Sequence, residues 1–287
     1  MHGVLNINKP SGMTSHDVVQ KVRRIAQEKR VGHTGTLDPL ATGVLVLCVG
    51  GATRIAQYLE AGEKEYDAVM RLGVTTDTLD AEGRVLETKQ YTPPRQQDII
   101  DALALFKGEI MQQPPLFSAI KVGGIPSYKL ARRGTAAVLA PRRVTIYRID
   151  LAAYDDPFVR LRVRCSKGTY IRSLCADIGE SLGMGAHLSS LIRTRSGRFS
   201  VENALSLERL AGQGVEKALI PLDEALADFP AATVNEGDAE RVRHGNPVAF
   251  AVAAPGRGGR IRVHDPSGNL LAIARAEGGM LRPEVVL

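Results

Sequence analysis

The segment from Val31 to Gly43 strongly restricts the backbone, because it places three glycines and one proline within thirteen residues. Glycine adopts backbone angles that are closed to other residues, whereas Pro39 fixes its own φ and biases Asp38 towards an extended conformation. A regular helix or strand through the whole segment is therefore excluded, and we expect a tight loop that holds the Asp38 carboxylate in one direction. The apolar run Val44–Val49 follows directly and predicts a buried strand.

A constrained loop beside a buried strand is a usual place for catalytic groups. Asp-Pro is also a common turn dipeptide, and most such carboxylates only cap the local backbone. The loop alone leaves both roles open for Asp38. Its full string from Gly32 to Gly43, G-H-T-G-T-L-D-P-L-A-T-G, closely resembles the catalytic loop of the TruB family, the tRNA pseudouridine-55 synthases. The resemblance implies that Asp38 is the essential catalytic residue.

Composition is that of an ordinary globular protein. The 287 residues are 44% hydrophobic and 24% charged, and this length favours about two domains. No stretch approaches the apolar length of a membrane span. The first seven residues lack the charged-then-apolar layout of a signal peptide, so we expect a cytoplasmic protein.

The net charge of +6 weakly favours a polyanionic partner. Each cluster of basic residues, taken alone, is more often a solvated surface. Several clusters beside motif regions together favour a nucleic acid. They are Lys21–Arg30, Arg132–Arg133, Arg142–Arg143, and Arg193 with Arg195 and Arg198.

The three cysteines are odd in number and have no C-x-x-C spacing. Cys48 and Cys165 lie in apolar or strand-like runs and are expected to be buried thiols. With six scattered histidines and no H-E-x-x-H motif, we expect neither a disulfide framework nor a metal site.

Two more strings extend the resemblance to the TruB family. C-S-K-G-T-Y-I-R occupies residues 165–172, and a third family stretch matches residues 183–191. The resemblance implies that Arg172 lies beside Asp38. It also implies that Tyr66 stacks on the target uracil and assists proton transfer. From the residues alone, Arg172 could be an ordinary helix-face arginine and Tyr66 a half-buried strand tyrosine.

Further substrate contacts follow from the same family pattern. Leu191 and Tyr170 are expected to complete the apolar walls of the uridine pocket, and His33 to take the stacking position that the extruded uridine leaves. Arg54 and Lys167 are candidate phosphate contacts. The acidic segment around Asp80 resembles one that lies near the family's active site. As a lone loop residue, His33 would instead be a hydrogen-bonded turn histidine.

Periodicity predicts the regular elements. Thr14 and Asp17 form a capping-box pattern before a helix with an apolar face through Ala26. Residues 53–59 and 171–182 also have helical patterns, and alternation predicts strands over residues 64–73, 144–151 and 158–165. The resemblance implies an α+β class, with a mixed, largely antiparallel sheet and flanking helices.

The family pattern divides the chain into residues 1–226, the catalytic domain, and residues 227–287, a small β-barrel resembling the PUA module. A basic, glycine-rich insertion at residues 123–143 is expected to close over the RNA. The C-terminal part offers a group of candidate phosphate contacts without a catalytic motif: Arg241, Arg243, Arg257, Arg260 and Arg262.

The function that the resemblance implies is isomerisation of uridine 55 in the T-arm stem-loop of tRNA. Nothing is oxidised and no group is transferred, so no cofactor is expected. We also expect a monomer that does not bind membranes. Two alternatives remain at this point, namely a pseudouridine synthase for another RNA and a catalytically silent RNA-binding chaperone.

Overall fold

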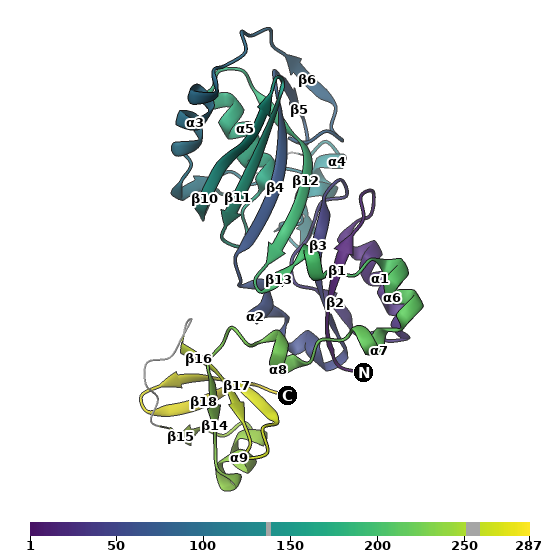
Figure 1. The fold of residues 1–287 in the computed structure, drawn as a ribbon, viewed down its shortest axis with the longest axis vertical. Helices are drawn as coiled ribbons and strands as arrows, with labels where there is room; N and C mark the ends of the chain where they lie inside the picture. Colours follow the sequence, from purple (N-terminus) through teal and green to yellow (C-terminus); the bar gives the residue numbers. More distant parts are fainter. Residues whose placement is uncertain (136–138, 251–258) are drawn as a thin grey trace.

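The computed structural model describes residues 1–135, 139–250 and 259–287. The molecule is elongated, with a large sheet in its upper and middle parts and a small C-terminal sheet at its lower end (Figure 1). The α+β class is confirmed, because the large sheet is mixed and helices flank it. No helix within the described ranges is long and apolar enough to cross a membrane.

The large sheet contains nine strands in the described residues and is largely antiparallel. Seven strands follow the order β1-β3-β12-β4-β11-β10-β7, while β2 pairs with β3 and β13 with β12. Among the described strands of this sheet, only β3 and β12 pair in parallel. The bounds are Gly3–Lys9 (β1), Val31–His33 (β2), Thr42–Val49 (β3), Lys64–Leu72 (β4), Gly108–Gln112 (β7), Arg142–Asp155 (β10), Phe158–Cys165 (β11), Ala186–Ser196 (β12) and Phe199–Ser200 (β13).

Strand β3 is buried on both faces, which explains its continuous apolar run. Alternate residues, such as Leu45 and Leu47, face the main core, whereas Val44 and Val46 face a second core. That second core also contains Ile273 from the C-terminal sheet. The buried strand predicted after the Asp38 loop is thus confirmed, and it joins the two parts of the molecule.

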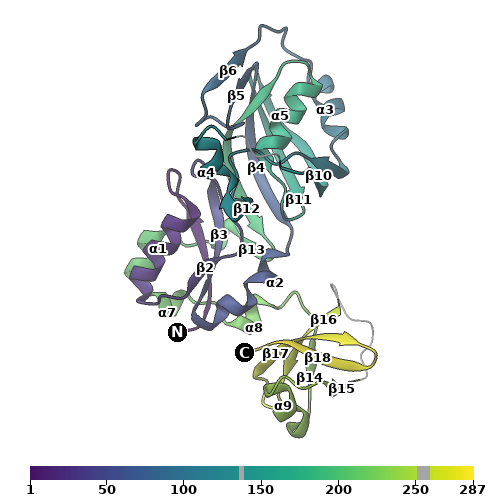
Figure 2. The ribbon, with the colours of Figure 1, turned by 180° about the vertical axis from the view of Figure 1, so that it is seen from behind.

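The helices lie mostly against the large sheet. Helices α3 and α5 contact β10, β4 and β12 on the side that faces the viewer in Figure 2. The helices and 3₁₀ turns run over Ser15–Ala26 (α1), Gly50–Ile55 (η1), Ala56–Glu60 (α2), Gln96–Ala104 (α3), Ser127–Arg132 (α4), Ile171–Ser181 (α5), Val201–Asn203 (η2), Leu207–Gln213 (α6), Val215–Ala218 (α7), Leu222–Ala225 (α8) and Glu236–Arg243 (α9).

The local predictions hold with small differences. The capping box of Thr14 and Asp17 is present at the start of α1. The helix predicted over residues 53–59 is instead a 3₁₀ turn, η1, followed by α2. In the glycine-rich segment, Val31–His33 pair with β3 and Thr42 and Gly43 begin β3, so the irregular part is confined to residues 34–41.

Two small hairpins flank the large sheet, with strands β5 (Val74–Thr76), β6 (Val85–Thr88), β8 (Lys121–Val122) and β9 (Ile125–Pro126). The segment 123–143, predicted to be an insertion, contains β9 and α4, and its last two residues already belong to β10. Residues 136–138 of this segment lie outside the described residues.

The C-terminal sheet has the order β14-β16-β17-β18-β15, with α9 packed against it. Its strands are Ala231–Thr233 (β14), Val248–Ala249 (β15), Arg260–His264 (β16), Leu270–Glu277 (β17) and Met280–Val286 (β18). This curled five-stranded arrangement fits the small PUA-like barrel that the sequence predicts. Its own core includes Val242, Val263 and Leu281.

Candidate active site

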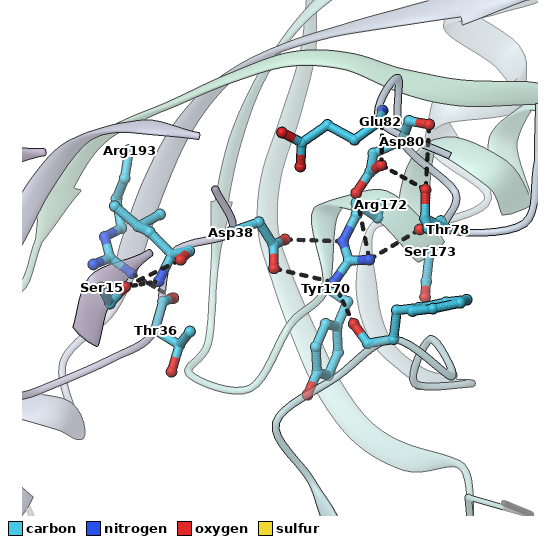
Figure 3. Close-up of polar contacts among 12 residues, drawn as sticks. Ser15, Thr36, Asp38, Thr78, Asp80, Glu82, Tyr170, Arg172, Ser173 and Arg193 are labelled. Atoms are coloured by element: carbon cyan, nitrogen blue, oxygen red, sulfur yellow. Dashed lines mark hydrogen bonds and ion pairs between the residues drawn. The ribbon is translucent and has the colours of Figure 1, made fainter. Parts of the chain in front are cut away.

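Asp38 lies at the centre of a set of buried polar contacts between the irregular loop and helix α5 (Figure 3). The Nε atom of Arg172 is 2.9 Å from one carboxylate oxygen of Asp38, and Nη2 donates to the other at 3.1 Å. The side chain of Arg172 is only 4% exposed, whereas that of Asp38 remains 31% exposed. The two-point contact therefore fixes the carboxylate while leaving it accessible to a ligand.

The guanidinium of Arg172 is itself held from several sides. Its Nη1 atom donates to the carbonyl of Thr78 at 2.9 Å and lies 3.5 Å from the carboxylate of Asp80. Its Nη2 atom also donates to the carbonyl of Phe117 at 3.0 Å. Two carboxylates thus share one buried cation, and Asp80 lies beside the site as the resemblance implied.

Asp80 is fixed by its own loop. One carboxylate oxygen accepts hydrogen bonds from the Thr78 hydroxyl at 2.6 Å and from the Glu82 amide at 3.1 Å. Leu79, between Thr78 and Asp80, has a φ of 63°, a conformation that is unfavourable for a residue with a side chain. Strained backbone of this kind clusters at functional sites because the surrounding contacts enforce it.

Burial dominates the electrostatics of Asp38. It raises the pKa of this carboxyl group above the ordinary value of 3.8, the neighbouring Arg172 opposes the rise, and Asp80 adds to it. The net direction is upward. The carboxylate is therefore a stronger base than an exposed aspartate, while Arg172 favours its charged form.

The far end of the loop is held by a buried lysine that the sequence analysis did not single out. Lys9, at the end of β1, is fully buried, and its ammonium group donates to the carbonyls of Pro10, Met13 and Pro39. The amide of Gly12 donates to the same carbonyl of Pro39 at 2.9 Å. Burial lowers the pKa of Lys9 to about 8. Pro39 follows Asp38 directly, so these contacts fix the chain on one side of the carboxylate.

Helix α1 holds the residue before Asp38. The hydroxyl of Ser15 accepts a hydrogen bond from the amide of Leu37 at 2.8 Å and donates one to its carbonyl at 3.0 Å. Ser15 is the first residue of α1, whose start is fixed by the Thr14 capping box. The helix start predicted from sequence thus has a second role, because it locks the backbone next to the carboxylate.

Tyr66, Leu191 and Tyr170 are the three predicted wall residues of the uridine pocket, and that role stays a prediction. Tyr66 on β4 and Leu191 on β12 are both buried and belong to the main core. Burial raises the pKa of Tyr66 to about 12, and Asp38 contributes to the rise, so the phenol is neutral at physiological pH. Tyr170 lies beside Arg172 in Figure 3.

Tyr170 is placed by a buried glutamine that the sequence analysis also missed. The side-chain amide of Gln112, which is fully buried on β7, accepts from the amide of Tyr170 at 2.8 Å and donates to its carbonyl at 3.0 Å. The guanidinium of Arg142 lies 5.4 Å from the centre of the Tyr170 ring, a cation–π contact.

His33 ends strand β2 at the start of the irregular loop and is half-buried. Its Nδ1 atom accepts a hydrogen bond from the amide of Gly35 at 3.4 Å. Burial, together with the nearby Arg193, lowers the pKa of His33, so the ring is neutral near pH 7. In the free protein it is therefore a hydrogen-bonded loop histidine.

Arg54 and Lys167 are not brought together with Asp38. Arg54 donates to the carbonyl of Val286 at 2.7 Å, at the junction with the C-terminal sheet. Lys167 lines a cleft of about 400 Å³ whose walls also include Tyr58 and Phe229. Both roles as phosphate contacts stay predictions.

The basic clusters divide into two kinds. Arg193, predicted as part of a surface cluster, is 2% exposed and donates to the carbonyls of Gly35, Thr36 and Val44, so its assignment to the surface was wrong. Arg195 and Arg198 are exposed. Within the described residues, no group of three or more His, Cys, Asp or Glu side chains could hold a metal ion.

Most of the C-terminal arginines already bind within the protein. Arg243 pairs with Asp265, Arg260 with Glu284 and Arg262 with Asp223. Arg241 donates to the carbonyl of Pro247 at 3.1 Å. Arg257 lies outside the described residues. Contact of these side chains with phosphate would have to compete with the intramolecular partners.

Comparison with known proteins accounts for nearly the whole chain. Residues 23–171 match the TruB family pseudouridylate synthase (N terminal domain). The chain belongs to this family. Residues 172–227 match the tRNA pseudouridylate synthase B C-terminal domain, and residues 229–287 match the tRNA Pseudouridine synthase II, C terminal.

Relatives of the same family confirm the match. A protein from Clostridium acetobutylicum named tRNA pseudouridine synthase B is 49% identical over 82% of this chain and 81% of its own length. One of the same name from Stutzerimonas stutzeri is 45% identical over 98% of this chain and 94% of its own length.

Solved structures with the same fold cover both sheets. One is a Cbf5–Nop10–Gar1 complex, with a TM-score of 0.77 and 30% identity. Another is an H/ACA RNP bound to a substrate RNA containing 2′-deoxyuridine, with a TM-score of 0.76 and 28% identity. Each match covers 99% of this chain and 84% of the chain in the complex.

Proposed function

We propose that this protein isomerises uridine to pseudouridine in tRNA. The observation that carries the proposal is the buried, two-point contact between Arg172 and Asp38 in a chain of the TruB family. The same site contains a neutral tyrosine and apolar walls, as recognition of an uncharged, aromatic base requires.

The reaction moves the uracil from an N1 to a C5 attachment. The bond between N1 and C1′ breaks, the base rotates, and C5 bonds to C1′. The hydrogen on C5 leaves as a proton and N1 gains one, so the atoms balance and no oxidant is consumed. An active site for this reaction therefore has to cleave one bond and retain the free base.

Asp38 is the group that suits the cleavage step. A carboxylate next to C1′ can form a covalent adduct there, or it can remove a proton from C2′ to give a glycal. Both routes need the charged form of Asp38 and benefit from a pKa above the ordinary value. Glycosidases use two carboxylates on either side of the scissile bond. Here Arg172 lies between Asp38 and Asp80, and of these two carboxylates only Asp38 is exposed towards a substrate.

Tyr66, Tyr170 and Leu191 form the walls that keep the detached base in place. A uridine inside a folded RNA loop has to be extruded first, at a cost of a few kcal/mol in lost stacking. His33, at the rim of the Asp38 loop, is the residue that would replace it in the stack. Because its ring is neutral, that role does not require a charge to be desolvated.

The substrate position that we assign is uridine 55 in the T-arm stem-loop. In this assignment residues 1–226 form the catalytic domain, residues 123–143 close over the RNA, and residues 227–287 form an RNA-binding module. Arg54 and Lys167 contact phosphates, and the enzyme acts as a monomer in the cytoplasm without a cofactor. The basic net charge of +6 supports an RNA substrate.

Release of tritium from tRNA labelled at C5 of uridine tests the proposal, because C5 loses its hydrogen only when the new bond forms. We expect one equivalent released per tRNA, and none from a tRNA in which uridine 55 is replaced by cytidine. Release that persists in that replaced tRNA would contradict the assigned position. No release from any RNA by a protein that binds tRNA would favour the silent chaperone.

A further inference from the structure

Arg193 is a buried cation on the large sheet. It lies on β12, where its backbone is packed so closely against Gly43 of β3 that an added Cβ at Gly43 would lie 2.3 Å from the Arg193 carbonyl oxygen. Gly43 has a φ of 96°, a conformation that favours glycine. The position of Arg193 relative to β3 is therefore fixed by main-chain packing as well as by its side chain.

The guanidinium joins two segments on either side of Asp38. Nε donates to the carbonyl of Val44 at 2.7 Å, and the two terminal nitrogens donate to Gly35 at 3.1 Å and Thr36 at 3.4 Å. The last two carbonyls precede Asp38 by three and two residues, and Val44 lies in the strand after the loop. Arg193 thus holds the start of the loop, as Lys9 holds Pro39 at its other side.

Arg193 also acts on Tyr66. The two residues are directly opposed on the antiparallel strands β12 and β4, so their side chains lie on the same face of the sheet. The positive charge of the guanidinium lowers the pKa of the Tyr66 phenol and so opposes the larger effect of burial. A guanidinium has only donors, so the group that Arg193 presents to the phenol favours a hydroxyl whose lone pairs face it.

We propose that Arg193 is a positioning residue. It holds the Asp38 loop and the Tyr66 hydroxyl in the relative positions that the isomerisation requires. The inference rests on the proposed function. A fully buried cation loses much of its hydration. An apolar side chain could fill the same space, but it could not make directional contacts to two loop carbonyls and a strand carbonyl at once.

The test compares Arg193→Lys with Arg160→Lys in single-turnover reactions on unmodified tRNA. Lysine keeps the charge but cannot reach both segments from one nitrogen. We expect the rate at saturating tRNA to fall about 100-fold for Arg193→Lys, because small misplacements of reacting groups have effects of that size. The dissociation constant for tRNA should stay within about threefold. Arg160→Lys, on the exposed face of the sheet, should match the wild type.

A double-mutant cycle with Tyr66→Phe separates positioning from general loss of stability. If Arg193 acts partly through the Tyr66 hydroxyl, Arg193→Lys should reduce the rate of the Tyr66→Phe protein by less than about 10-fold. An equal factor in both backgrounds would overturn the inference. So would a wild-type rate for Arg193→Lys, whereas an inactive wild-type protein would instead refute the proposed function.

Each variant is first checked by circular dichroism and thermal unfolding, and rates are measured where it is folded. Should Arg193→Lys not fold, Arg193→Gln replaces it, since glutamine keeps a donor group without the buried charge. The same separation is expected, with a large fall in rate and little change in tRNA affinity. Wild-type turnover by a folded Arg193→Gln protein would also overturn the inference.

Discussion

Arginines lie on both sides of the large sheet, and their surroundings on the two sides are opposite. On the face covered by α3 and α5, Arg172 and Arg193 are buried and make at least three polar contacts each. On the other face, the side chains of Arg160 and Arg164 are 53% and 50% exposed and pair with carboxylates of neighbouring residues on or next to β4. Arg193, Arg160 and Arg164 all occur in basic stretches of the sequence, but only the buried arginines reach the Asp38 loop.

The comparison shows that partner and burial, more than charge, assign an arginine its role. Exposed pairs gain little because water and salt screen them. A buried guanidinium loses hydration and is stable only when its donors are satisfied, which also fixes the groups that satisfy them. The covered face can therefore hold the Asp38 carboxylate in place, whereas the open face provides a solvated surface.

The largest expected effect comes from Asp38→Asn. The substitution keeps the shape but removes the charge, the nucleophile and the base together. We expect single-turnover rates at least about 10⁴-fold below the wild type, with tRNA affinity within about tenfold. Tritium release and filter binding measure the two quantities. Substantial turnover by the purified variant would refute the assignment of Asp38.

Arg172→Lys should have the next largest effect. Lysine retains a positive charge but cannot contact both carboxylate oxygens of Asp38 and the carbonyls of Thr78 and Phe117 together. We expect a rate about 100-fold lower, or 2.7 kcal/mol in the barrier. The matched control is Arg160→Lys, whose rate should not change. Equal rates for the two variants would remove the contrast between the faces.

Asp80→Asn should have a moderate effect. Arg172 keeps its contacts with Asp38 and two carbonyls, so we expect about a tenfold lower rate and an intact fold. Thermal unfolding alongside the rate measurement checks both statements. A rate as low as that of Asp38→Asn would mean that Asp80 takes part in the chemistry directly.

Arg160→Gln should have the smallest effect. It removes an exposed pair with Asp67, in which both contacts are 2.8 Å, and leaves the covered face unchanged. We expect a change in Tm of no more than about 2 °C and unchanged turnover. A marked loss of tRNA affinity would show that the open face binds RNA after all.

The sequence predicted the covered face only in part. Motif strings located Asp38 and Arg172, and local signals located the α1 capping box and strand β3. Lys9 and Arg193 were not assigned to the site, because burial of a long cation depends on segments that are distant in the sequence. A signal for Arg193 was present. In a strand, residues two apart share a face, so the predicted pocket residue Leu191 placed Arg193 on the same face.

Gln112 shows a different limit. Its side-chain amide binds the backbone of Tyr170, 58 residues away, through a pairing that depends on β7 lying at the edge of the sheet. No local pattern indicates such a contact. The C-terminal arginines show the converse, since a basic composition suggested phosphate contacts while tertiary structure supplied Asp223, Asp265 and Glu284 as partners.

The most direct test of the central claim, that Arg172 holds Asp38 as the reactive carboxylate, is the pH dependence of the single-turnover rate. The rate should fall on acidification, with an apparent pKa above 3.8, because burial raises the pKa of Asp38. Arg172 lowers that pKa and Asp80 raises it. Arg172→Gln should therefore move the acid limb to higher pH, and Asp80→Asn should move it to lower pH. Arg160→Gln should leave it unchanged. Acid limbs that coincide in all four proteins would contradict the account.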